Sequence, residues 1–335
     1  MKYLDRSKIL GYQATLIFTT ARRGIGKSWT AKDYSIYHAA TNAEKKSFIY
    51  LRRYKNELKA NKTKLLDNMQ DSVTSLGRYT LKGDTYYLDN KPIGYAVPLS
   101  CYTDYKSVPF EKVSNVIFDE FIPENKRIKG YLADECEAFA SFMSTVLRNR
   151  REFNDSWCRF WCIGNLSESI TPYNAYFHLP PFDKKYFDKE RGILVYPSDL
   201  NNIQEGEKGT QLERALRGTT YYDFNFNNKP ISEDMSYVKP MPQRGMRCML
   251  VVRVGGVDLG IYYEFTTGDL YISTKCDPCF YNKVTIDRSL PDNYVYLHRK
   301  MVSSKIIKNA LYAGRVFYDD LKAKILAEEF IKYVK

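Results

Sequence analysis

The sequence contains no long hydrophobic run and few histidines. No segment approaches the about 18 consecutive apolar residues of a membrane-spanning helix, and residues 1–15 carry charges where a secretory signal is apolar. The 3 histidines are scattered along the chain, which argues against a catalytic triad or a histidine metal cluster. These absences predict a protein that is neither secreted nor inserted into a membrane.

Cysteine usage argues against a disulfide-stabilised fold. The chain has 7 cysteines, an odd number, and without a secretory signal they are expected to remain reduced. Cys276 and Cys279 form the only C-x-x-C pair, and no second pair stands at zinc-finger spacing. We therefore predict no zinc site.

Length and charge describe a globular protein with an anionic partner. At 335 residues, 44% of them hydrophobic, the chain is long enough for two domains with large cores. The formal net charge of +12 favours a polyanion, although a basic protein without such a partner has the same charge.

Residues 19–28 are the most informative segment of the chain. They follow a short apolar run and precede a helix-compatible stretch, which is the strand, turn and helix order of a nucleotide-binding P-loop. Gly24 and Gly26 allow a tight turn in which backbone N–H groups point at phosphate oxygens. Ala21 replaces the first glycine of the usual pattern, which is a small steric change. The alternative interpretation is a surface turn rich in glycine and lysine.

The end of this segment supplies the side chains that a nucleotide needs. Lys27 would reach the β- and γ-phosphates, and the Ser28 hydroxyl would hold Mg²⁺. The helix that follows would direct its positive dipole end at the same phosphates. We therefore predict ATP and Mg²⁺ as the ligands.

A second motif ends the apolar segment 113–118, where Asp119 and Glu120 follow. Ligands bind at the carboxyl ends of the strands in parallel α/β sheets, so these carboxylates are expected beside the P-loop. Asp119 would complete the metal site, and Glu120 would activate the attacking water. Alone, the pattern also fits a strand that ends in a solvated turn. Downstream of a P-loop, it predicts an ATPase core.

The pattern of strands and helices divides the chain into three parts. Residues 1–200 predict a P-loop ATPase domain of the additional-strand type, with a mainly parallel α/β sheet. Residues 201–245 are rich in turn-forming residues and predict a linker subdomain. Residues 246–335 predict a smaller α+β domain, in which a strand meander precedes helices at 305–311 and 318–334.

Three further elements are predicted in the first domain: a strand at 47–53, a β-ribbon at 79–99 and an amphipathic helix at 131–151. The apolar segment 157–165 predicts another strand, which ends in Asn165. Additional-strand ATPases place a polar residue there, where it senses the γ-phosphate or orients water. Asparagine is also common in turns, so this pattern by itself leaves both interpretations open.

The motifs, in this order, resemble the DNA packaging ATPases, or encapsidation proteins, of phi29-like bacteriophages. The resemblance covers most of residues 1–170 and is weaker in the C-terminal half, where size, a strand meander and a late basic helical segment match. Ala21 stands where this family usually has glycine. The matching segments are 21–28, 48–55, 94–100, 116–121 and 145–150.

The resemblance implies a homo-oligomeric ring, a pentamer in this family, that drives double-stranded DNA into a viral procapsid with the energy of ATP. Its partners would be double-stranded DNA, the portal or connector of the procapsid and, in some of these phages, a packaging RNA. It would act in the host cytoplasm at the portal vertex. Contact with DNA would be made through phosphates, so binding would weaken steeply with salt.

Several residue roles follow from the resemblance. Arg148 would reach the γ-phosphate of a neighbouring subunit as a trans arginine finger, although basic residues also favour helix C-termini. Lys106 would act at the subunit interface, and Lys27 would be catalytic. The expected nucleotide-binding residues are Arg23, Gly24, Ile25, Gly26, Lys27, Ser28 and Trp29.

Arg52, Arg53 and Lys55 form a basic group at the end of the second predicted strand. They are expected to contact the DNA backbone or to form a lid over the nucleotide. A solvated basic edge is the alternative interpretation.

The C-terminal domain is expected to be a relic of the ribonuclease H-like nuclease that large terminases carry. A working nuclease needs several carboxylates that converge on metal ions. No acidic residue lies in the middle of the predicted strand 248–254, and Asp258 lies at a strand edge. We therefore expect a domain without nuclease activity that docks to nucleic acid or to the portal.

Two other functions fit the P-loop core. A translocase or helicase outside packaging would share the core and would not depend on procapsids. A small-molecule kinase would transfer phosphate to an acceptor other than water, and Glu120 together with Arg148 argues against it.

Overall fold

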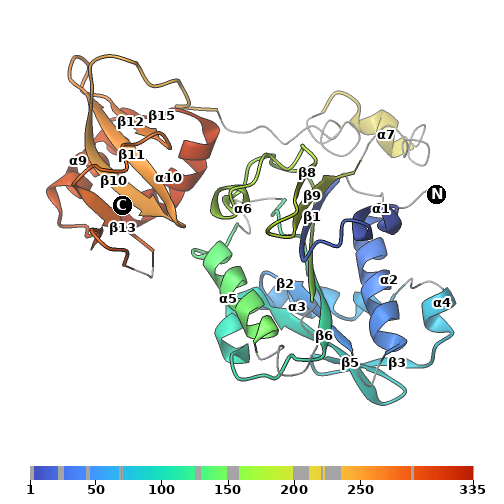
Figure 1. The fold of residues 1–335 in the computed structure, drawn as a ribbon. Helices are drawn as coiled ribbons and strands as arrows, with labels where there is room; N and C mark the ends of the chain where they lie inside the picture. The colour runs from blue at the N-terminus through green and yellow to red at the C-terminus, as the bar shows by residue number, and fades with distance from the viewer. Residues whose placement is uncertain are drawn as a thin grey trace. The chain divides into compact units, whose positions relative to one another are not determined.

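The computed structural model describes residues 4–21, 26–42, 46–67, 69, 71–124, 130–148, 158–198, 211–219, 222, 235–287 and 290–334. The chain forms two compact units, Met1–Ser169 with Phe182–Ser232, and Ile170–Pro181 with Glu233–Lys335 (Figure 1). Residues 170–181 thus group with the second unit, although they lie inside the predicted domain 1–200. Most of the predicted linker, 201–245, lies outside the described residues. Among the described helices, none is long and apolar enough to cross a membrane.

The first unit is built on a nine-stranded sheet with the order β3-β4-β5-β2-β6-β7-β1-β9-β8. Neighbouring strands from β5 to β9 in this order are parallel, whereas β3, β4 and β8 pair antiparallel. The strands are β1 (Leu16–Thr20), β2 (Ser47–Arg52), β3 (Tyr79–Lys82), β4 (Thr85–Leu88), β5 (Lys91–Pro98), β6 (Val113–Asp119), β7 (Arg159–Gly164), β8 (Tyr186–Asp188) and β9 (Ile193–Pro197).

Strand β7 lies between β1 and β6 and is parallel to both, which confirms the predicted additional-strand arrangement. The carboxyl ends of the three strands meet at one edge of the sheet. Thr20 is level with Gly164, and Asp119 is level with Ile163. The P-loop strand and the carboxylate strand therefore end side by side, with β7 between them.

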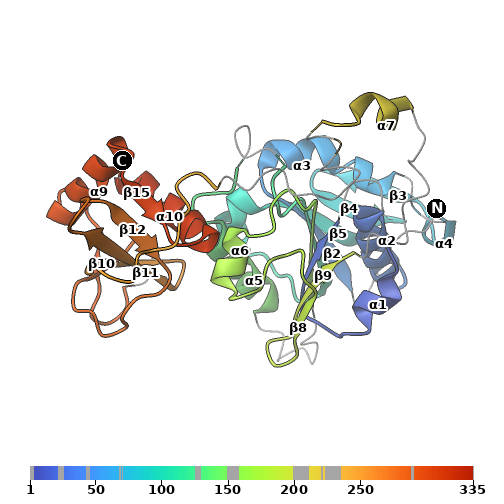
Figure 2. The same ribbon diagram turned by 90° about the horizontal axis from the view of Figure 1, so that it is seen from above.

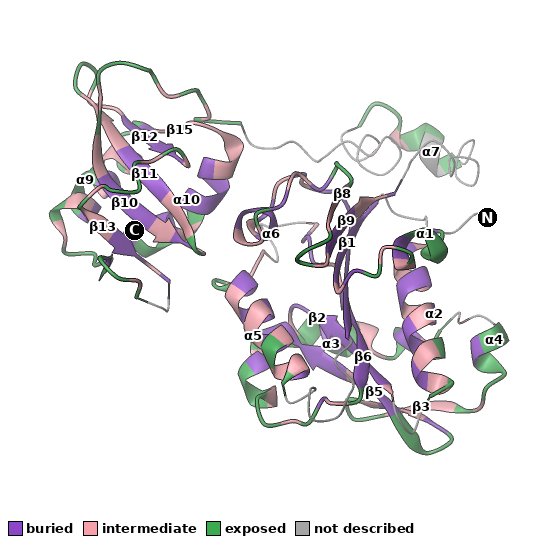
Figure 3. Cartoon of the chain, in the orientation of Figure 1, coloured by how far each residue is buried: buried purple, intermediate pink, exposed green. Residues whose placement is uncertain are grey.

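Helices cover both faces of this sheet, and alternation along the strands decides which residues each helix buries. Ile117 belongs to the core that contains the apolar residues of α2, whereas Phe118 packs against Phe139 of α5 with 5.4 Å between ring centroids. Figures 1 and 2 show α2 and α5 on opposite sides of the sheet, and Figure 3 shows the central strands buried throughout. The helices are α1 (Arg6–Leu10), α2 (Lys27–Ala40), α3 (Lys55–Asn61), α4 (Asp71–Thr74), α5 (Glu135–Leu147) and α7 (Gln211–Leu216), with 3₁₀ turns η1 (Lys64–Leu66) and η2 (Leu99–Tyr105).

Helix α5 is shorter at its start than the predicted span of 131–151. The carboxylate of Glu135 accepts a hydrogen bond from the Leu132 backbone N–H at 2.9 Å, so the chain turns before the helix begins. Residues 149–151 lie outside the described residues.

The second unit has a six-stranded sheet with the order β14-β13-β10-β11-β12-β15. Strands β10 to β12 form the predicted antiparallel meander, and β13 joins β10 in parallel. Without β15, the strands lie in the order β12-β11-β10-β13-β14. Numbered from one to five along the chain, this is 3-2-1-4-5, the strand order of ribonuclease H-like folds. The elements are β10 (Met246–Val254), β11 (Val257–Glu264), β12 (Leu270–Ser273), β13 (Lys283–Thr285), β14 (Val295–Tyr296), β15 (Val316–Tyr318), α6 (Pro172–Tyr176), α9 (Val302–Tyr312) and α10 (Leu321–Val334).

The predicted helix 318–334 begins later than expected, because residues 316–318 form β15. This strand pairs in parallel with β12, so that Ile272 lies beside Tyr318. Val316 and Tyr318 face the apolar core of the second unit, and this burial favours a strand over one more helical turn.

Candidate active site

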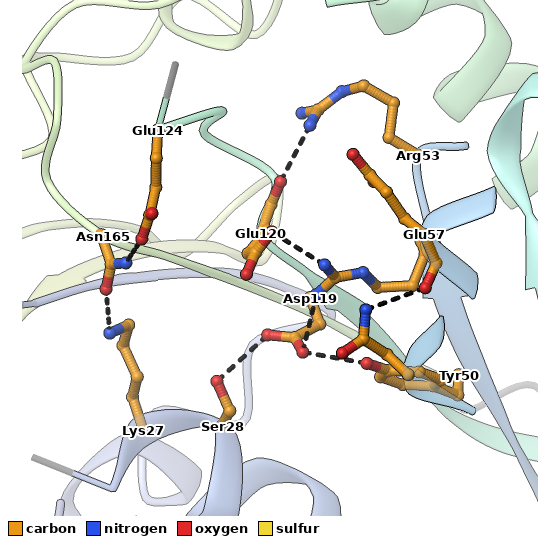
Figure 4. A network of polar contacts seen from close by, with 11 residues as sticks. Lys27, Ser28, Tyr50, Arg53, Glu57, Asp119, Glu120, Glu124 and Asn165 are labelled. Atoms are coloured by element: carbon orange, nitrogen blue, oxygen red, sulfur yellow. Dashed lines mark hydrogen bonds and ion pairs between the residues drawn. The ribbon is translucent and has the colours of Figure 1, made fainter. Parts of the chain in front are cut away.

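A cleft of about 390 Å³ opens at the carboxyl edge of the parallel sheet. Residues that are distant in the sequence converge on it from β6, β7 and the first turn of α2 (Figure 4). Its lining residues are Lys27, Ser28, Asp119, Glu120, Glu124, Ile163, Gly164 and Asn165.

The amino end of α2 places Lys27 and Ser28 at the cleft. Gly26 precedes the helix with a φ of 74°, a left-handed conformation that favours glycine. Lys27 is buried, and its Nζ donates a hydrogen bond to Oδ1 of Asn165, a contact that Figure 4 shows. The structure therefore brings together the predicted phosphate-binding lysine and the predicted sensor asparagine.

The other predicted P-loop residues either lie outside the described residues or do not line the cleft. Arg23, Gly24 and Ile25 lie outside the described residues. Trp29 is half-buried on α2 and does not line the cleft. Ala21 is buried at the end of β1, where its N–H donates to the Gly164 carbonyl oxygen at 3.2 Å.

Ser28 and Asp119 form an oxygen-rich corner of the cleft. The Ser28 hydroxyl donates to Oδ1 of Asp119 at 3.0 Å, and the Tyr50 hydroxyl donates to Oδ2 of the same carboxylate at 3.1 Å. A hydroxyl and a carboxylate are hard oxygen donors of the kind that Mg²⁺ prefers, and the ion usually keeps several waters beside them. The donor set of Ser28 and Asp119 therefore fits Mg²⁺.

Glu120 lies in the cleft in a strained backbone conformation. Its φ of 60° is in the left-handed region, which is uncommon for a residue with a side chain. Burial raises the pKa of Glu120 above its usual range, although Arg52 opposes the shift. The Asp119 carboxylate raises this pKa further. A glutamate with a raised pKa in a cleft is a candidate general base.

Arg52 joins both carboxylates of the β6 motif. Its Nη1 lies 3.0 Å from Oδ2 of Asp119, and its Nη2 lies 2.8 Å from Oε2 of Glu120. The side chain is only 5% exposed. Burial and these two ion pairs contradict the expectation that Arg52 contacts DNA phosphates. The structure places it against the two carboxylates, Asp119 and Glu120, that line the cleft.

Arg53 points to the opposite face of the sheet, and its burial also argues against the predicted contact with DNA. Its Nε lies 2.6 Å from Oε2 of Glu135, and this pair is 2% and 1% exposed. The same guanidinium donates to the carbonyl oxygens of Glu120 at 3.0 Å and Phe121 at 2.5 Å. Arg53 therefore fixes the backbone that follows β6. Lys55 is exposed at the start of α3, where a contact with DNA stays a prediction.

Arg148 and Lys106 lie together on the surface, and neither residue lines the cleft. The Arg148 Nη2 donates to the Lys106 backbone carbonyl oxygen at 2.7 Å, and both residues are exposed. Arg148 has an extended backbone at the carboxyl end of α5. The two predicted interface residues therefore form one patch, although they are far apart in the sequence.

Sequence patterns did not identify two residues of the site. Tyr50 stands two positions before Arg52 on β2, so both side chains are on one strand face, and this spacing could have indicated it. Glu124 follows the β6 motif and accepts a hydrogen bond from Nδ2 of Asn165. Nothing local in the sequence distinguishes Glu124 from a solvated loop residue.

Comparisons with known proteins find similar proteins over the whole length of the chain. The profile of the family described as podovirus DNA encapsidation protein (Gp16) matches residues 1–335. The DNA packaging protein of Bacillus phage phi29 is 28% identical over 338 residues, which cover 99% of this chain and 98% of the relative. The DNA packaging protein of Bacillus phage B103 is 27% identical over 330 residues, with 98% and 99% covered.

Solved structures match over the same range. A chain of the bacteriophage phi29 viral genome packaging motor assembly has a TM-score of 0.68 and 26% identity, with 100% of both chains covered. The crystal structure of the N-terminal domain of the DNA packaging ATPase from bacteriophage phi29 has a TM-score of 0.51 and 32% identity. It covers 60% of this chain and 98% of that one.

Proposed function

Because this chain belongs to the podovirus DNA encapsidation protein (Gp16) family, we propose that it hydrolyses ATP to move double-stranded viral DNA into a procapsid. The observation that carries the proposal is the convergence of Lys27, Ser28, Asp119 and Glu120 on one cleft at the carboxyl edge of the sheet. A nucleotide-binding lysine, a metal corner and a candidate base are the parts that ATP hydrolysis needs. The related DNA packaging proteins and packaging motor supply the link to DNA.

Nucleotide binding would use the amino end of α2. Lys27 would turn from Asn165 to the β- and γ-phosphates, and the Ser28 hydroxyl and Asp119 would hold Mg²⁺. When bound, this ion neutralises phosphate charge and polarises the terminal phosphate. Glu120 and Glu124 also line the cleft. Because these carboxylates repel a triphosphate, we expect nucleotide affinity to depend strongly on the divalent cation.

Hydrolysis would use Glu120 as the general base. One carboxylate oxygen would take a proton from the attacking water, whose oxygen forms the new bond to the γ-phosphorus while the bond to the leaving ADP oxygen breaks. The ion pair with Arg52 holds this carboxylate in place. We therefore propose that Glu120 turns from Arg52 to the water once the nucleotide is bound.

Arg148 would act on the active site of a neighbouring subunit. Its position outside the cleft of its own chain supports an action in trans, and an arginine finger is worth about 10³–10⁵ in rate. Lys106 lies on the same patch and would contribute to the same subunit interface. This proposal requires a homo-oligomeric ring, a pentamer by resemblance.

The second unit and the exposed basic residues would make the remaining contacts. The net charge of +12 supports binding to DNA phosphates, and Lys55 is an exposed candidate contact. The second unit would dock to nucleic acid or to the portal, and a packaging RNA is a further candidate partner. We propose that the protein works in the host cytoplasm at the portal vertex.

The test is steady-state ATP hydrolysis by the purified protein with and without double-stranded DNA and matching procapsids. We expect stimulation by DNA and procapsids together, and its loss in Glu120→Gln. Glu57→Gln is the matched control, because it removes a nearby carboxylate that does not line the cleft. A rate of ATP hydrolysis that neither DNA nor procapsids change would contradict the packaging role.

A further inference from the structure

Asn165 connects a positive and a negative group across the cleft. Nζ of Lys27 donates to its Oδ1, and its Nδ2 donates to Oε1 of Glu124 (Figure 4). An ammonium group can only donate hydrogen bonds, and an ionised carboxylate can only accept them. One orientation of the amide therefore satisfies both neighbours: the oxygen toward Lys27 and the nitrogen toward Glu124.

This arrangement is partly shielded from water. Asn165 is 7% exposed and Lys27 is 8% exposed, whereas Glu124 is half-buried on the segment that follows β6. A buried amide that loses a hydrogen-bond partner is destabilised, so its orientation depends on the two neighbours. If the nucleotide takes the ammonium of Lys27, Glu124 remains as the group that fixes this orientation.

We propose that Glu124 is a positioning residue that holds the amide oxygen of Asn165 in the nucleotide cleft. This inference rests on the proposed ATPase function. With Lys27 on the terminal phosphate, the Asn165 oxygen is an acceptor in the cleft that Glu120 also lines. It accepts a hydrogen bond from the attacking water and orients that water toward Glu120. Rotation of the amide would present an N–H donor to the water instead, which misorients it.

The first experiment compares Glu124→Ala with Glu124→Gln. Alanine removes the acceptor for Asn165, and kcat is expected to fall about tenfold, the effect of one oriented hydrogen bond. Glutamine keeps a carbonyl oxygen that accepts from the amide, so kcat should stay within about threefold of wild type. Binding of a fluorescent ATP analogue, measured in parallel, should change much less than kcat in Glu124→Ala. Measured at a pH above the acidic limb of the pH profile, Glu57→Gln controls for the loss of a carboxylate near Glu120.

The second experiment exchanges the two polar groups. In Asn165→Asp, the new carboxylate cannot donate to Glu124 and is repelled by it, so kcat should fall at least tenfold. Adding Glu124→Gln supplies an amide donor for the new carboxylate and restores a complementary pair. We expect the double variant to regain at least about threefold in kcat over Asn165→Asp alone. If Glu124 does not contact position 165 during hydrolysis, no such rescue is expected.

The inference would be overturned by wild-type kcat in Glu124→Ala, or by an exchange variant no faster than Asn165→Asp. If Asn165→Asp does not fold, as judged by its melting temperature, the comparison of alanine and glutamine at position 124 decides. Equal loss in these two would also reject the positioning role. A wild-type protein that does not hydrolyse ATP would instead contradict the proposed function, so the two failures are distinguishable.

Discussion

The guanidinium of Arg53 and the carboxylate of Glu135 form an ion pair that solvent barely reaches, with Nε and Oε2 2.6 Å apart. Arg53 also donates to the backbone carbonyl of Glu120, whose φ of 60° is unusual for a residue with a side chain. One buried side chain thus connects the backbone of the candidate base to the first turn of α5. The other end of that helix meets the patch of Arg148 and Lys106.

Removal of Arg53 should destabilise the first unit. Arg53→Ala leaves the Glu135 carboxylate buried without its ion-pair partner, and this is expected to cost about 3–5 kcal/mol of unfolding free energy. Arg53→Lys should recover only part of the loss, because an ammonium cannot reproduce the forked contact with carboxylate and carbonyls. Urea denaturation followed by intrinsic fluorescence measures both. Lys55→Ala, at an exposed position, is the control; an equal shift in the control would reject the argument.

The dependence of ATP hydrolysis on pH should be set by the protonation of the Glu120 carboxylate. Because burial raises its pKa, kcat should fall with decreasing pH at a higher pH than for an ordinary glutamate. The positive charge of Arg52 lowers this pKa, so Arg52→Gln should move the acidic limb of the profile to higher pH. Glu57 raises the pKa, and Glu57→Gln should move the limb to lower pH. Profiles of kcat against pH that shift in the same direction in both variants would contradict the assignment of Glu120 as base.

The Tyr50 hydroxyl should increase the affinity of the Ser28 and Asp119 site for Mg²⁺. Tyr50→Phe removes the hydroxyl that orients Asp119 without a change in shape, and the half-saturating Mg²⁺ concentration should rise about tenfold. Titration of Mn²⁺ by electron paramagnetic resonance, with nucleotide present, measures binding without turnover. Tyr86→Phe is the matched control, because this buried tyrosine donates to the Lys62 carbonyl and not to Asp119. An equal change in metal affinity in the two variants would contradict a specific role of Tyr50 in metal binding.

Mixtures of two inactive variants should show whether Arg148 acts on the active site of a neighbouring subunit or on that of its own chain. Arg148→Ala and Glu120→Gln are each expected to be inactive alone, with Arg148→Ala reduced about 10³–10⁵-fold. When the two are mixed, a subunit with an intact Glu120 can lie beside one with an intact Arg148, so activity should partly return. A mixture of Lys27→Ala with Glu120→Gln should stay inactive, because both defects lie in the same cleft. No recovery in the first mixture would reject the trans finger.

The second unit should not cleave DNA. Asp258 is engaged by Arg253 at 3.3 Å and by the Tyr294 hydroxyl at 2.8 Å. Asp287 accepts hydrogen bonds from the backbone N–H groups of Gly255 and Gly256, at 2.7 and 2.9 Å, and so stabilises the turn after β10. Incubation with supercoiled DNA and Mn²⁺ should leave the DNA intact. Metal-dependent cleavage that Asp258→Ala abolishes would contradict this.

The additional-strand core and five of the residues that line the cleft could be predicted from the sequence. The P-loop segment that contains Lys27 and Ser28, and the apolar strand that ends in Asp119, are local patterns whose chemistry depends on adjacent residues. The apolar segment that leads to Asn165 is likewise a local pattern, which predicts a strand that ends in a polar residue. These features could be predicted because a parallel sheet brings the carboxyl ends of its strands to one edge.

The contacts of the two neighbouring arginines depend on the tertiary structure. Arg52 and Arg53 look like one basic group in the sequence, but successive residues of an extended chain point in opposite directions. Arg52 pairs with Asp119 and Glu120, whereas Arg53 reaches Glu135, 82 positions away. Glu124 likewise acquires its candidate role from a contact with Asn165, 41 positions away. Such pairs depend on distances between strands and loops, which the local sequence pattern does not contain.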